Sequence, residues 1–160
     1  MWYTGAMAID DLYERDFYEW TKAQAEALRA HARTKEARAS NAIDWEHVAG
    51  EIEDLGNSDY FAVRSFTTRI IEHLFKLAWS QFENPRAGWQ AEILRFRGEL
   101  AGRLSKTLRK RLEGDVEALH VAAGKAVERE FRGREQETVC DMTWRWTLRQ
   151  ILGEENDPIG

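Results

Sequence analysis

Apolar residues recur at spacings of three and four along most of this chain. That spacing places them on one side of a helix and is typical of amphipathic helices that share a core. The pattern is interrupted at residues 33–43, at the pair Asn84 and Pro85, and again at Ser105–Thr107. Proline disfavours helix in the residue before it, and hydroxyl side chains favour helix starts. The interruptions therefore indicate connections between helices.

Four long helices and one short helix follow from this pattern. Their expected ranges are 10–32, 45–82, 89–104, 108–133 and a C-terminal segment beginning near Thr143 or Thr147. Since short connections make successive helices antiparallel neighbours, we predict an all-α protein: an antiparallel up-down four-helix bundle with a short C-terminal helix. We expect a single domain over residues 1–160, with an ordered core at about 10–153.

The segment 45–82 places polar residues on its apolar stripe. Asp59 and His73 occupy positions where leucine or valine would pack. Buried polar groups cost stability unless they are hydrogen-bonded, so these two are either register devices or parts of a site. Gly56 leaves two alternatives: the helix ends there and restarts with Ser58 as its cap, or it continues with a bend. The stripe keeps its phase across Gly56, which favours the continuous helix.

Composition and charge limit the classes of function. The 160 residues carry a net charge of −5 and are 43% hydrophobic, which is typical of a soluble globular protein. An acidic chain is a poor general nucleic-acid binder, because phosphate neutralisation requires clustered positive charge. The single cysteine, Cys140, excludes an intrachain disulfide and favours a reducing, cytoplasmic location. We expect no signal peptide and no membrane-spanning segment.

Several strings in this sequence resemble a known family when they are taken in order. They are YERDFYEWTKAQAEALR at 13–29, AIDWEHVAGEIEDLG at 42–56, IIEHLFKLAWSQF at 70–82 and GWQAEILRFRGEL at 88–100. Over about residues 10–155, the chain is similar to a bacterial family known as domain of unknown function number twenty-nine. The resemblance implies a small, all-helical, cytoplasmic protein. It implies no activity, because none is established for the family.

The chain also departs from that family's pattern. It has Gly50-Glu51 in place of a paired Glu-Glu, Leu74-Phe75-Lys76-Leu77 in place of Leu-Leu-Lys-Trp, and Asp141 in place of proline after Cys140. The resemblance matches some of the recurrent polar positions without giving them roles. These positions are Glu51, Glu53, His73 and Lys76.

Acidic residues gather at the start of the second predicted helix, where Asp44 is a candidate N-cap. They are Asp44, Glu46, Glu51, Glu53, Asp54 and Asp59, with no lysine or arginine between them. Asp44, His47 and Glu51 share one helix face, and histidine and carboxylate one turn apart can chelate a divalent metal. The alternatives are a solvated acidic face near a helix start and an acidic surface that binds a partner.

Three other polar positions are candidates for a site or for structural roles. In a hairpin centred near Pro85, His73 would lie opposite residues 96–97, either as a hydrogen-bonded core histidine or as an acid-base group. Gln24 lies on the apolar stripe of the first helix and is interpreted as a register device. Glu117 and His120 form one copy of the Glu-x-x-His motif that di-metal bundles use twice.

A basic run lies at residues 95–111. It holds seven cations with only Glu99 opposing them: Arg95, Arg97, Arg103, Lys106, Arg109, Lys110 and Arg111. It could bind a phosphate backbone, but few aromatic residues interleave it for base stacking. A solvated face, or a complement to the acidic region, is the favoured interpretation.

We therefore predict a helical protein of unknown activity that acts through association with itself, as in a homodimer, or with another protein. An enzyme is not favoured, and no cofactor, membrane partner or nucleic-acid partner is expected. The first alternative is a metal-dependent enzyme that uses Asp44, His47 and Glu51, or His73. The second is nucleic-acid binding through residues 95–111. The candidates for polar core or interaction residues are Gln24, Glu51, Glu53, His73 and Lys76.

Overall fold

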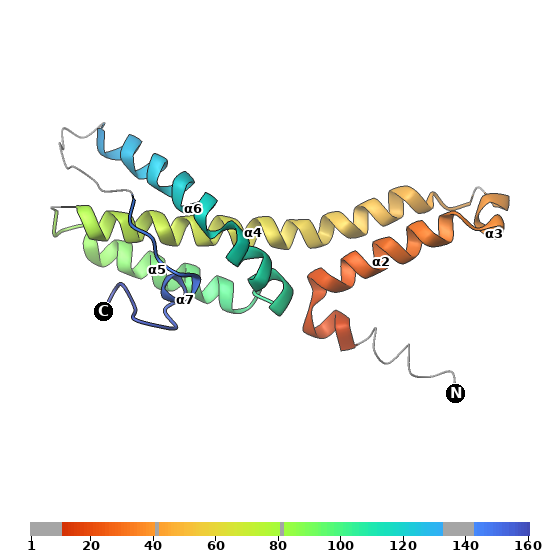
Figure 1. Ribbon diagram of the computed structural model, residues 1–160, viewed down its shortest axis with the longest axis horizontal. Coiled ribbons are helices and arrows are strands. Elements are labelled where there is room, and N and C mark those ends of the chain that lie inside the picture. The colour runs from red at the N-terminus through yellow and green to blue at the C-terminus, as the bar shows by residue number, and fades with distance from the viewer. Residues whose placement is uncertain (1–10, 41, 81, 133–142) are drawn as a thin grey trace. The chain divides into compact units, whose positions relative to one another are not determined.

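The computed structural model describes residues 11–40, 42–80, 82–132 and 143–160. Its labelled helices (Figure 1) are α2 (Phe17–Ala32), α3 (Lys35–Ala39), α4 (Trp45–Trp79), α5 (Arg86–Ala101), α6 (Lys106–Arg132) and α7 (Leu148–Ile151). Residues 11–15 are helical as well, and no strand occurs within the described ranges. The all-α prediction is confirmed.

Helix boundaries lie close to the predicted ones. Helix α4 continues through Gly56, so the favoured alternative is confirmed, but α4 ends at Trp79, before the predicted Phe82. The connection predicted at 33–43 contains the short helix α3. Of the two predicted starts for the last helix, Thr147 is the cap of α7. Outside the described residues lie Asp10, Gly133 and Cys140.

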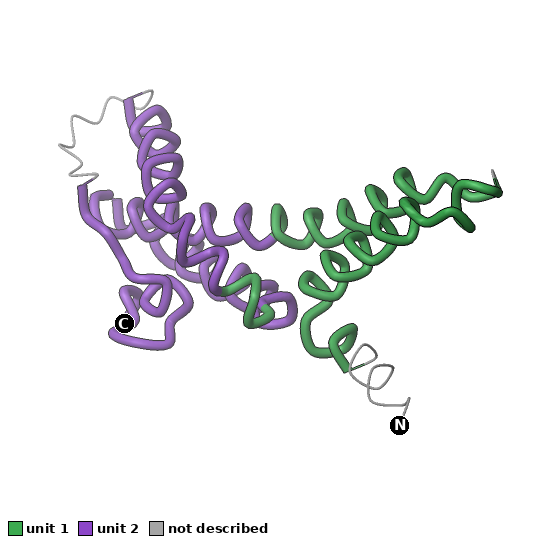
Figure 2. The backbone as a smooth tube through the Cα atoms, turned by 45° about the vertical axis from the view of Figure 1, so that its right-hand side comes forward, with its two compact units in different colours: residues 1–62, 105–109 green, residues 63–104, 110–160 purple. Residues whose placement is uncertain are grey.

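The chain divides into two compact units, which Figure 2 distinguishes by colour. Unit 1 comprises residues 1–62 and 105–109, and unit 2 comprises residues 63–104 and 110–160. Helices α4 and α6 therefore contribute residues to both units. The assembly of all four long helices into one up-down bundle stays a prediction.

Small side chains set the spacing of α2 and α4 in unit 1. Thr21, Ala25 and Ala49 are at most 1% exposed. A Cβ atom at Gly56 would lie 2.1 Å from Thr21 Oγ1, so the two helix backbones approach too closely there for any side chain. The two helices are antiparallel in Figure 1, and small residues on both allow this close contact.

Asp16 caps two helix starts within unit 1. Its Oδ1 accepts hydrogen bonds from the Glu19 N–H at 3.1 Å and the Ser105 hydroxyl at 2.8 Å. Its Oδ2 accepts one from the Thr107 N–H at 3.0 Å, in the first turn of α6. Burial opposes ionisation of Asp16, but the hydrogen bonds from Thr107, Glu19 and Ser105 outweigh it and lower the pKa of the carboxyl.

In unit 2, the second part of α4 lies between α5 and α6. Phe66 and His73 both contact the Phe96 ring of α5. Lys76 pairs with Glu130 of α6 at 2.7 Å. Side chains at helical spacing fill the core between these helices. The buried residues include Ile70, Ile71, Leu74, Phe75, Ile93, Leu100, Leu112, Leu119 and Val127.

Arg97 of α5 fastens the C-terminal segment to unit 2. Its guanidinium donates to the Ile151 carbonyl at 2.9 Å, to the Gln150 carbonyl at 3.2 Å and to both Asp157 oxygens at 2.9 Å. Gly153 has a φ of +76°, and a Cβ atom there would lie 2.7 Å from the guanidinium. Glycine is therefore required at this turn both by its backbone conformation and by the close approach of Arg97.

Two glycines of α4 in unit 1 provide a test of this packing. Gly56→Ala is expected to lower the free energy of unfolding by about 1–3 kcal/mol, because the added methyl group overlaps Thr21. Gly50→Ala is the matched control, since nothing lies within 4 Å of its Cβ position. It should raise stability by about 0.5–1 kcal/mol through helix propensity. Chemical denaturation measures both changes, and equal stabilisation by the two variants would contradict the close contact.

Candidate functional site

One side of the α2–α4 hairpin in unit 1 is held by ion pairs. The Glu53 carboxylate accepts hydrogen bonds from Lys22 and from Arg29, each at 2.8 Å. These two hydrogen bonds lower the pKa of Glu53 to about 2, Lys22 having the larger effect. Glu53, which the sequence marks as an interaction candidate, is thus engaged within its own unit.

The opposite side of the hairpin is apolar and open. Trp20, Leu28, Val48, Ile52 and Leu55 recur at helical spacing, turned away from the ion pairs, and are here called the open apolar face. Leu55 is 57% exposed and Val48 is 39% exposed, while the other members are half-buried. The hairpin is therefore amphipathic as a whole.

Gln24 lies within the open apolar face, between Trp20 and Leu28 on α2. Its side chain is half-buried and forms no hydrogen bond within the described parts of the chain. The sequence marks Gln24 as a polar residue on an apolar stripe, and the structure places that stripe at the surface of unit 1.

Asp44, the first residue of the acidic face, caps the start of α4. Asp44 accepts a hydrogen bond from the His47 backbone N–H at 3.1 Å, which confirms it as the N-cap, and its other oxygen lies 2.7 Å from His47 Nδ1. These contacts lower the pKa of Asp44 and raise that of His47. Glu51 is exposed. Among the described residues, no three histidine, cysteine or acidic side chains form a group that could hold a metal ion. The geometry therefore adds no support to the metal-dependent alternative.

His73 and Lys76 lie in unit 2 and point toward different helices. His73 stacks on Phe96 at 6.2 Å between ring centroids, which confirms the predicted position opposite residues 96–97. Its Nδ1 is buried and has no hydrogen-bond partner in the described part of the chain. Burial, followed by the charge of Lys76, lowers the pKa of the imidazole. Lys76 pairs with Glu130 instead. The two candidates therefore do not form a common site.

His120 is a buried link to the C-terminal segment. Its Nδ1 lies 2.8 Å from the Val116 carbonyl, and its Nε2 lies 3.1 Å from the Trp146 backbone N–H. A carbonyl only accepts and an amide N–H only donates, so the ring is neutral, with its proton on Nδ1. Burial lowers the pKa of His120 accordingly. Glu117 pairs with Arg145 at 2.9 Å, so the Glu-x-x-His pattern serves structure here.

Parts of the basic run are committed to contacts within unit 2. Arg97 has a side chain only 10% exposed and holds the C-terminal segment through Asp157. Arg95 pairs with Glu92 at 2.7 Å. The run is therefore not a continuous row of outward-facing cations, which weakens the nucleic-acid alternative.

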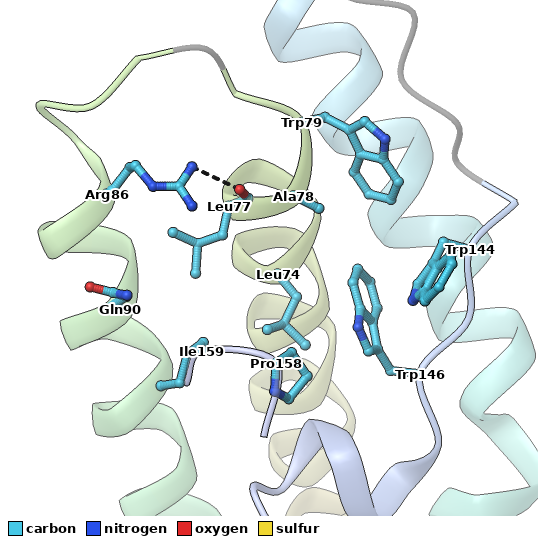
Figure 3. Close-up of a pocket in the computed structure, with 10 residues that line it drawn as sticks. All are labelled: Leu74, Leu77, Ala78, Trp79, Arg86, Gln90, Trp144, Trp146, Pro158 and Ile159. Carbon is cyan, nitrogen blue, oxygen red and sulfur yellow. Dashed lines mark hydrogen bonds between the residues drawn. The ribbon is translucent and has the colours of Figure 1, made fainter. Parts of the chain in front are cut away.

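A pocket of about 450 Å³ lies at the C-terminal end of α4 in unit 2 (Figure 3). Its walls include Leu74, Leu77, Trp79, Arg86, Trp144 and Trp146. They come from α4, from the start of α5 and from the C-terminal segment. The sequence indicates no such pocket, because its walls lie far apart in the chain and periodicity does not report contacts between distant segments.

Comparison with known proteins identifies the family. A family model described as Domain of unknown function DUF29 matches residues 12–156. The chain belongs to the DUF29 family. The resemblance drawn from the sequence strings is thus confirmed. A crystallised alpha-helical protein of unknown function from Rhodospirillum rubrum has the same fold as this DUF29 protein, with a TM-score of 0.76 and 22% identity over 91% of this chain and 92% of the other.

No protein of curated function matches this DUF29 chain. Neither the family nor the structural relative has an established activity. Within the described residues, no helix is both long enough and apolar enough to cross a membrane.

His73→Leu tests whether this histidine is only structural. We expect the variant to be as stable as the wild type, or more stable by about 1–2 kcal/mol, because it removes a buried polar atom that no described residue hydrogen-bonds. The pKa of His73 lies below its ordinary value of 6.5, so the unfolded chain binds the proton more readily. The wild type should therefore lose stability relative to the variant as the pH falls below 6.5.

His47→Leu is the control for this titration. The pKa of His47 is raised, so its contribution to stability is present below its ordinary value of 6.5 and is lost as the pH rises through the raised value. Its pH dependence should have the opposite sign to that of His73. Chemical denaturation above and below pH 6.5 measures the stability of each variant relative to the wild type. If His73→Leu instead loses several kcal/mol of stability, His73 belongs to a buried hydrogen-bond network.

Proposed function

We propose that this protein acts through self-association, with the open apolar face of unit 1 as the contact surface. The observation that supports this most directly is the exposure of Leu55 and Val48 beside three half-buried apolar residues on one side of the hairpin. Contiguous exposed apolar surface bounded by polar residues is typical of protein interfaces.

The hairpin itself gives the physical reason. Helices in stable domains bury their apolar stripe against another layer of structure. In unit 1, α2 and α4 bury Thr21, Ala25 and Ala49 against each other. The neighbouring apolar residues on one side need a further layer. Two copies of the hairpin packed face to face would supply it and would form an antiparallel four-helix bundle across a two-fold axis.

A second copy of this chain suits the face better than a partner of different chemistry. A two-fold interface must be complementary to itself, so each group has to be compatible with its own copy. The Gln24 amide satisfies this condition because it both donates and accepts, whereas a charged residue would meet its own charge. The five members of the open apolar face are themselves uncharged.

The composition of the chain supports a cellular location for this association. We place the protein in the cytoplasm, supported by its single cysteine and its mildly acidic charge. The absence of a metal-ligand group among the described residues gives no support for an enzyme.

Leu55→Glu is expected to weaken self-association by about tenfold or more, because it places a carboxylate on each side of the two-fold contact. Sedimentation velocity over a wide range of protein concentration, up to high micromolar, measures the change. Leu94→Glu is the matched control: Leu94 is 59% exposed, close to the 57% of Leu55, but belongs to α5 in unit 2.

A wild-type protein that stays strictly monomeric at high micromolar concentration would refute self-association. An association that persists in Leu55→Glu and is lost in Leu94→Glu would refute the assigned surface. Circular dichroism of both variants confirms that each remains helical, since both substitutions are at exposed helix positions.

A further inference from the structure

The pocket in unit 2 combines an aromatic wall with one positive charge. Trp79, Trp144 and Trp146 form one side of it, and Leu74 and Leu77 form its floor (Figure 3). Trp144 is 59% exposed although it borders the pocket. Flat indole surfaces beside leucine side chains suit a planar apolar body. A volume of about 450 Å³ is within the range of small-molecule sites.

Among the described residues that line the pocket, Arg86 alone carries a charge. It projects from the start of α5, on the side opposite the tryptophans (Figure 3). The described lining residues include no carboxylate, and Gln90 supplies a neutral amide one helical turn further along α5. The lining therefore selects against cations and favours an anion.

Helix α5 adds to the positive potential at this end of the pocket. It begins at Arg86, its N-cap Pro85 provides no side-chain hydrogen bond, and its first turn contains no acidic residue. The positive end of the helix dipole thus lies beside the guanidinium, and neither the N-cap nor the first turn of α5 supplies a compensating side chain.

The alternative role for Arg86 is structural. Its Nη1 donates to the Leu77 carbonyl at 2.8 Å, which satisfies one open carbonyl near the end of α4. This bond uses one N–H of a group that carries several, and the Arg86 side chain forms no other hydrogen bond among the described residues. The remaining N–H groups are available for a ligand, and the bond to Leu77 holds the guanidinium in place for it.

We propose that this pocket binds a small monocarboxylate with an aromatic body. The ring would lie against Trp144 and Trp146, and the carboxylate would accept hydrogen bonds from Arg86. Arginine and carboxylate form charge-assisted hydrogen bonds, which are stronger inside a partly enclosed pocket than in water. This proposal concerns unit 2 and does not depend on the association assigned to unit 1.

Three naphthalene probes with the same ring and an anionic, a neutral or a cationic end group test the site by isothermal titration calorimetry: naphthylacetate, naphthylethanol and naphthylethylamine. The carboxylate should bind at least about tenfold more tightly than the alcohol, and the amine should bind most weakly. No binding of naphthylacetate at millimolar concentration would overturn the proposal. So would an alcohol or amine that binds as tightly as the carboxylate.

Arg86→Gln should remove the preference for the carboxylate and leave the affinity for the alcohol unchanged. Arg86→Lys keeps both a positive charge and a donor for the Leu77 carbonyl, so it should retain part of the preference. If Arg86→Gln also abolishes binding of the alcohol, Arg86→Lys decides. A lysine variant that binds the alcohol normally but shows no preference would overturn the role of the charge.

Trp144→Ala tests the aromatic wall independently of the charge. It should weaken binding of the carboxylate and the alcohol to a similar extent, by about tenfold, because both present the same ring. Trp89→Ala is the matched control, since Trp89 lies on α5 but does not line the pocket. Equal effects of the two tryptophan substitutions would overturn the assigned site.

Discussion

A pair of packed helices can bury only one stripe of each helix, and this constraint governs unit 1. Thr21 and Gly56 bring α2 and α4 so close that little apolar surface is needed at their contact. The side chains on the two sides of that contact differ in character. On one side, Glu53 pairs with two cations, an arrangement that is stable in water. On the other, the leucines and tryptophan remain partly exposed, and the case for a further layer of structure rests on them.

In unit 2, the chain's own C-terminal segment supplies the further layer that covers apolar surface of the helices. Apart from the four-residue helix α7, this segment has no regular element to direct its packing. Two polar groups fix its position instead: His120 receives the Trp146 N–H, and Arg97 binds Asp157 together with two backbone carbonyls. Each buried polar atom in these contacts has a partner, so its desolvation is offset. The tryptophan wall of the pocket is a consequence of where these bonds hold the segment.

The sequence predicts those features that depend on local spacing. The helices, the continuity of α4 through Gly56, the cap at Asp44 and the position of His73 opposite Phe96 all follow from periodicity and hairpin geometry. It does not predict contacts between distant segments. Arg97 belongs to a basic run in the sequence, yet its partner lies 60 residues away, and no periodic signal connects them. The sequence does not predict the pocket for the same reason, since the pocket walls come from separate parts of the chain.

Unused bonding capacity separates structural polar residues from candidates for function. Glu53, Lys76 and His120 have partners within their own units, and no external group is needed to complete them. Gln24 and Arg86 differ, because each keeps donors that nothing among the described residues engages. Each also lies beside apolar surface that water covers poorly. A polar group with unused hydrogen-bond donors or acceptors, next to exposed apolar surface, is typical of a binding site. A second hairpin could use such a group at Gln24, and a small anion could use one at Arg86.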